Sequence, residues 1–169
     1  MATILRLIDG INRLAGVYVK YLILPMTFIV LYEVCCRRLL NSPTSWAFDM
    51  TTYVFGAYFI LGLGYVELHD RHIRIDIISQ QLPKKIQLWL RILTFPAFFL
   101  PFVASLTWAG VELAADSWAM WEHGQSAWRP PIYPIKTILP IGAFLLLIQG
   151  FSSFVKDIRK LKGGSDHES

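Results

Sequence analysis

Cysteine is scarce in this sequence. Among its 169 residues only Cys35 and Cys36 are cysteines, and they are neighbours. Adjacent cysteines close only a strained disulfide and lack the spacing of a metal site. A relay of redox-active thiols needs two pairs, usually with C-x-x-C spacing. We therefore predict no disulfide, no thiolate metal site and no thiol–disulfide chemistry.

Charge is missing from the centres of the apolar stretches. Charged residues make up 17% of the chain and hydrophobic residues 54%, and the mean hydropathy is +0.46. This apolar content exceeds what the core of one soluble domain requires, and a lipid-facing surface accounts for the excess. We predict an all-α integral membrane protein that forms one domain over residues 1–169. Its four transmembrane helices are expected at about residues 14–36, 46–66, 92–111 and 135–155.

The expected spans also lack ionisable residues at membrane depth. A carrier that moves ions by itself is expected to keep such a residue well inside a span. Glu33, Asp49 and Glu112 lie instead at span ends. We interpret Glu33 and Asp49, together with Arg37 and Arg38, as an ion-paired cluster at the membrane interface. A small autonomous carrier is kept as an alternative.

Histidine is absent from the expected spans. The four histidines fall in the second loop, the third loop and the tail: His69, His72, His123 and His167. A haem held between facing imidazoles needs histidines within the helices. We predict no haem, no other cofactor, no metal and no catalytic residue. A membrane anchor of a respiratory enzyme is kept as a second alternative.

The segment between the second and third spans is polar and cannot cross a bilayer. In residues 72–82 one helical face carries roughly Ile73, Ile77, Ile78 and Leu82, and polar residues fall elsewhere. This pattern predicts an amphipathic helix that lies in the cytoplasmic interface. Pro83 is expected to end it. A kink is expected further on, because the third span contains Pro96 and Pro101.

The basic residues are distributed unevenly between the two sides. Of 16 Lys and Arg, twelve lie in the two termini and the second loop, and four in the other loops. The positive-inside rule then places both termini in the cytoplasm. Because these residues lie at the edges of apolar runs, nucleic acid is not an expected partner.

Arg6 and Arg13 precede a run too long for a signal peptide, which indicates a retained first span.

Small residues line one face of the second span. Gly56, Gly62 and Gly64, with Thr52 one turn before, permit close approach of another helix. The sequence leaves open whether that helix belongs to this chain or to a partner.

Several ordered motifs carry a resemblance to a known family. They begin with Tyr32-Glu33-Val34, Arg37, Arg38, Asn41-Ser42-Pro43-Thr44, Trp46 and Asp49. They continue with Gly62 to Gly64, His72-Ile73-Arg74-Ile75-Asp76 and Leu82-Pro83. The last group is Ser126, Trp128, Pro130, Pro131, Pro134, Lys136, Pro140 and Gly142. In this order they resemble the small membrane subunit (DctQ-type) of tripartite ATP-independent periplasmic, or TRAP, transporters.

The sequence departs from the family pattern in its second span. Asp49 stands where Glu is frequent, and Tyr53 stands where Arg is common. These departures affect the polar contacts expected of that span and leave the expected architecture unchanged.

The resemblance implies a role in a three-part secondary transporter of the bacterial inner membrane. The small subunit would be a scaffold for a large DctM-type membrane subunit. That subunit would import an organic solute, by default a carboxylate, with a sodium gradient, after a periplasmic solute-binding protein delivers it. Membrane lipids are the other expected partners. The candidate structural or partner-interface residues are Glu33, Arg37, Arg38, Trp46, Asp49, Gly62, His72, Arg74 and Asp76.

Overall fold

The computed structural model describes residues 2–69 and 84–163, which are helical apart from loops and one bridge between His123 and Pro131. Four helical segments are long and apolar enough to cross a membrane: Thr3–Leu39, Ala47–Leu68, Ile92–Ala119 and Tyr133–Arg159. For these residues, the prediction of an all-α protein with four helices long and apolar enough to span a membrane is confirmed. The amphipathic helix expected at residues 72–82 lies outside the described residues.

The first helical segment begins well before the expected span of residues 14–36. It consists of α1 (Ala2–Val19), the 3₁₀ turn η1 (Lys20–Leu22) and α2 (Ile23–Leu39). α1 buries Leu5, Asn12 and Val19, which recur every seven residues and so share one face. The 3₁₀ turn lies within one helical turn before Pro25, whose missing N–H removes one helical hydrogen bond.

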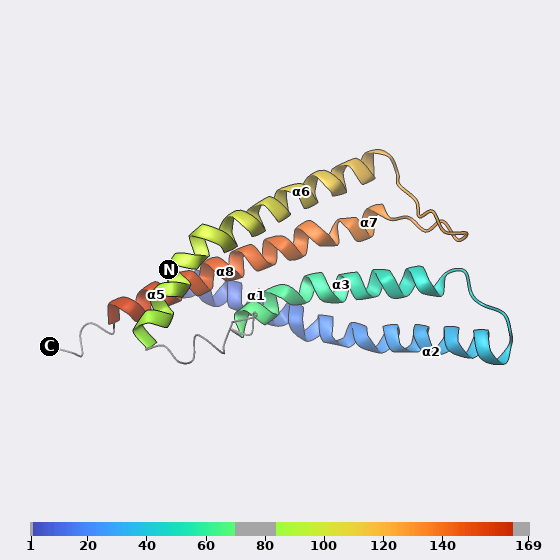
Figure 1. Ribbon diagram of the computed structural model, residues 1–169, viewed down its shortest axis with the longest axis horizontal. Coiled ribbons are helices and arrows are strands. Elements are labelled where there is room, and N and C mark those ends of the chain that lie inside the picture. The colour runs from blue at the N-terminus through green and yellow to red at the C-terminus, as the bar shows by residue number, and fades with distance from the viewer. Residues whose placement is uncertain (1, 70–83, 164–169) are drawn as a thin grey trace.

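The third span is interrupted as its prolines predict. α5 (Lys84–Thr94) passes into a π-helical turn, η2 (Phe95–Phe99), and then into α6 (Leu100–Ala119). Pro96 lies in the first turn of η2, and such a turn is a common cause of a helix kink. Figure 1 shows α5 and α6 running in clearly different directions.

The helices form a row at the end of the molecule that carries the loops 40–46 and 120–132. α3 (Ala47–Leu68) packs against α2 on one side and against α8 (Ile138–Gly163) on the other. α8, preceded by the short α7 (Tyr133–Lys136), also packs against α6. The order across the row is α6, α8, α3, α2 (Figure 1). At the opposite end α1 contacts both α3 and α8.

Close helix approaches hold α8 at the centre of this arrangement. A Cβ added at Gly142 would collide with the backbone of Ile60 in α3. Gly110 of α6 brings that helix against Pro140 of α8. Gly150 of α8 lies against the rings of Phe95 and Phe99. Small residues at these crossings let the backbones approach closely, which strengthens packing in lipid.

Candidate functional site

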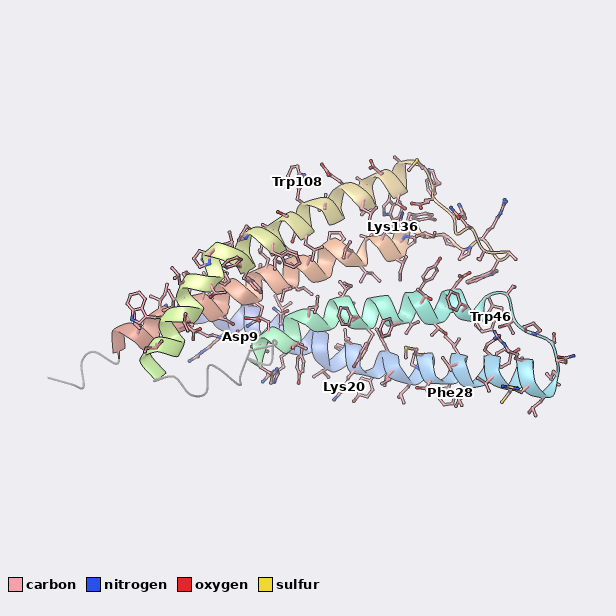
Figure 2. All side chains as sticks on the ribbon, viewed as in Figure 1. Asp9, Lys20, Phe28, Trp46, Trp108 and Lys136 are labelled. Atoms are coloured by element: carbon pink, nitrogen blue, oxygen red, sulfur yellow. The ribbon has the colours of Figure 1, made fainter. Side chains whose placement is uncertain are left out.

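Two polar regions lie at opposite ends of the helices. We call the end with the loops 40–46 and 120–132 the hairpin end, and the end with the start of α1 and the close of α8 the termini end. Figure 2 marks Trp46 and Lys136 at the hairpin end and Asp9 near the termini end. Phe28 and Trp108 project from opposite edges of the row, where lipid or a partner can meet them (Figure 2).

A polar network joins α1 to α8 near the termini end. Lys156 Nζ lies 2.7 and 2.6 Å from the two carboxylate oxygens of Asp9. Gln149 Nε2 and Ser152 Oγ donate to the same carboxylate at 3.1 and 3.2 Å. Asn12 Nδ2 donates to Gln149 Oε1 at 3.0 Å. Asn12, Gln149 and Ser152 are fully buried, and these bonds pair their polar atoms in a low-dielectric interior, except for Asn12 Oδ1, which has no hydrogen-bond partner among the described residues.

The small-residue face of α3 is used partly inside this bundle. A Cβ at Gly64 would collide with Asn12 Oδ1, and one at Gly62 would lie 3.9 Å from Val19 Cγ1. Nothing lies within 4 Å of a Cβ at Gly56. The first two positions therefore pack against α1, and the third is open.

The first hairpin loop is fixed by Glu33. Its carboxylate accepts hydrogen bonds from Arg37, from the backbone N–H of Thr44 at 3.1 Å and from the Thr44 hydroxyl. The Tyr32 and Trp46 rings lie 5.8 Å apart across the same loop. These contacts tie the end of α2 to the residues that lead into α3.

The interactions of Asp49 and Arg38 differ from those expected in an ion-paired cluster. Glu33 pairs with Arg37, as the i, i+4 spacing on a helix allows. Asp49, however, accepts a hydrogen bond from Ser126 in the other hairpin loop. Arg38 makes no hydrogen bond or ion pair with the residues that the structure describes. The cluster is thus one ion pair, one link between loops and one arginine without an internal partner.

The second hairpin loop is held by Glu122. Lys136 and Ser117 both donate to its carboxylate, and these bonds, with that of Lys136 the largest effect, hold the pKa of Glu122 below its ordinary value. The Ile132 backbone N–H donates to the Glu122 backbone oxygen at 2.9 Å. The carboxylate thus connects α6, the loop and α7.

Aromatic rings cover this loop. The Trp118 and Tyr133 ring centres lie 4.5 Å apart, and those of Trp121 and Tyr133 lie 5.4 Å apart. Trp118 Nε1 also donates to Thr137 Oγ1 at 2.9 Å. Trp121 has a φ of 47°, a left-handed conformation that bulky residues rarely adopt. The ring contacts and the bonds of Glu122 hold the backbone in that conformation.

The candidate residues from the sequence are only partly brought together. Glu33, Arg37, Arg38, Trp46 and Asp49 gather at the hairpin end, whereas Gly62 lies toward the termini end. The remaining candidates, His72, Arg74 and Asp76, lie outside the described residues. Sequence reasoning missed the network around Asp9. Its only signal was Gln149, Ser152 and Lys156 at spacings of three and four, which place them on one face of the last helix.

A family comparison covers most of the chain. A family described as "Tripartite ATP-independent periplasmic transporters, DctQ component" matches residues 26–160. The match includes the hairpin end, three of the four candidate spans and residues 26–39 of the first, whereas α1 lies outside it. None of the curated proteins compared with the chain matches it.

Proposed function

The chain belongs to the DctQ family of TRAP transporter components, and from this premise we propose that it is the non-catalytic scaffold subunit of a TRAP-type secondary transporter. Its partner is a large DctM-type membrane subunit that moves the solute. A periplasmic solute-binding protein delivers that solute, which is an organic molecule, by default a carboxylate. The large subunit couples its import to a sodium gradient.

The observation that supports a scaffold best is the internal use of polar side chains. Asn12, Gln149 and Ser152 are fully buried and engage each other or Asp9. Polar groups that line a substrate path would instead face a water-filled cavity. At the hairpin end, Ser126 and Asp49 connect the two loops. Helices held at both ends suit a fixed frame beside a moving transport domain.

We assign the hairpin end to the periplasm and both termini to the cytoplasm of the bacterial inner membrane. The support is the distribution of Lys and Arg, with twelve residues on the side of the termini and four on the other. The ion pair of Asp9 with Lys156 agrees with this assignment, because it requires that α1 and α8 have their polar ends on one side. Cysteines introduced one at a time at Ser126 and near the C-terminus, probed with a membrane-impermeant thiol reagent in cells, test it.

Co-purification tests the subunit role. The full chain, tagged at its C-terminus, is extracted from its native membrane in mild detergent, and mass spectrometry identifies what accompanies it. Recovery of a much larger multi-span protein in near-equal amount supports the proposal. Recovery of this chain alone, folded and after cross-linking, contradicts it and favours an autonomous carrier. A haem absorption band in the purified protein would favour a respiratory anchor.

We further propose that His72, Arg74 and Asp76 fix a cytoplasmic helix of the frame. Asp76→Ala and Arg74→Ala are expected to lower complex assembly or uptake while leaving the affinity of the isolated binding protein unchanged. Normal uptake by both variants at normal abundance would remove this role from the three residues.

A further inference from the structure

A groove lies between α2 and α3 at the hairpin end. It has a volume of about 430 Å³, and its apolar walls come from both helices. The walls are formed by Val30, Val34, Ala47, Phe48 and Thr51, and the rim by Glu33, Arg37 and Arg38. The Thr51 hydroxyl is already bonded to the Ala47 backbone oxygen at 2.8 Å. The groove therefore has apolar walls and a charged rim.

The rim carries an excess of positive charge. Glu33 is neutralised by Arg37 and also accepts two hydrogen bonds from Thr44. Arg38 has no acceptor among the residues that the structure describes. Two arginines against one carboxylate leave one net positive charge. An anionic ligand would neutralise this charge.

The position of the groove indicates what kind of molecule carries that negative charge. Arg37 and Arg38 lie in the last turn of α2, where a spanning helix reaches the headgroups. Val30 lies two turns deeper, about 10 Å into the apolar region. Phe48 is 78% exposed, so the wall of the groove continues into the outer surface of the helices. A ligand with a charged head and an apolar tail fits both parts.

We propose that this groove binds an anionic phospholipid. The phosphate lies against Arg38 and the N–H groups of Arg37 that Glu33 leaves free, and an acyl chain follows Val30, Val34 and Phe48. An acidic segment of a partner protein would match the arginines but would leave the deep apolar wall unused. This proposal rests on the membrane location of the helices and does not depend on the transporter role.

Native mass spectrometry of the full chain tests the proposal. The purified protein is offered equal amounts of phosphatidylglycerol and phosphatidylcholine in mild detergent, and the bound lipids are counted. We expect a preference for phosphatidylglycerol that Arg38→Gln lowers about fivefold, since one arginine near a lipid surface contributes about 1 kcal/mol. Arg129→Gln is the matched control, because Arg129 is an exposed arginine in the other hairpin loop. It should leave the preference unchanged.

Two further measurements distinguish the lipid from other occupants. Glycerol 3-phosphate, a soluble anion, should not displace the bound phosphatidylglycerol. A photoreactive phenylalanine analogue in place of Phe48 should cross-link to lipid in native membranes, and this readout does not depend on the Arg38 variant. Equal losses from Arg38→Gln and Arg129→Gln, displacement by glycerol 3-phosphate, or cross-linking to a protein instead of lipid would each overturn the proposal.

Discussion

Asp9 and Lys156 form an ion pair although 147 residues separate them in the chain. The pair joins α1 to α8, and Gln149 and Ser152 add donors to the same carboxylate. Asp9 therefore organises the contact between α1 and α8 near the termini end.

The coupling between these two residues can be measured directly. In a double-mutant cycle with Asp9→Asn and Lys156→Gln, we expect a coupling of about 1 kcal/mol, because both side chains keep some solvent contact. Thermal unfolding in detergent provides the free energies. Strictly additive effects of the two substitutions would show that the pair contributes nothing to stability.

The close approach of α8 to α3 predicts an asymmetry between two glycines. Gly142→Ala should destabilise the protein by about 1–3 kcal/mol, because the new methyl group meets the backbone of Ile60 and a helix must move. Gly56→Ala is the control, since nothing lies within 4 Å of a Cβ there. Denaturation in detergent compares them. Equal tolerance of both changes would contradict the packing of α3 on α8.

Glu122 should make the hairpin end sensitive to acid. Its folded-state pKa is below the ordinary value of 4.5, so its contribution to stability is complete above that value and is lost as the pH falls through the lower one. Glu122→Gln should lower stability at neutral pH and flatten the acid decline. Tryptophan fluorescence reports it, because Trp118 and Trp121 lie in this region. An unchanged acid profile in the variant would exclude this role.

The link between Ser126 and Asp49 predicts a local effect on dynamics. Ser126→Ala removes the hydroxyl that bonds Asp49, so amide hydrogen exchange in the loop 120–132 should become faster. Gln125→Ala is the matched control, since Gln125 is exposed beside it. The spanning helices should exchange as before. If the two variants exchange alike, the link does not restrain the loop.

Hydropathy was sufficient to find the spanning helices, because lipid requires long apolar segments whatever the tertiary structure. The first helix extends beyond the expected span of residues 14–36, since α1 begins at Ala2 and carries Arg6, Asp9 and Arg13. Asp9 is accommodated because Lys156 pairs with it, and nothing near Asp9 in the sequence indicates that partner.

Local spacing similarly predicted one half of the hairpin cluster. Glu33 and Arg37 lie one turn apart on the same helix, so their pairing follows from helix geometry. The partner of Asp49 is Ser126, which reaches it only because the two hairpin loops lie side by side. Contacts of this second kind depend on the order of the helices across the row. No local pattern in the sequence encodes that order.

The central place of α8 has a consequence for biosynthesis. α6 finds its main packing partner in α8, through Gly110 and Pro140 among other contacts, and α8 follows α6 in the chain. α1, α2 and α3 can associate as soon as they are inserted, whereas α6 must wait in lipid until α8 has been made. Ribosomes stalled before residue 138 would therefore hold a three-helix subassembly with an unpaired α6, which is the intermediate that membrane quality control would encounter.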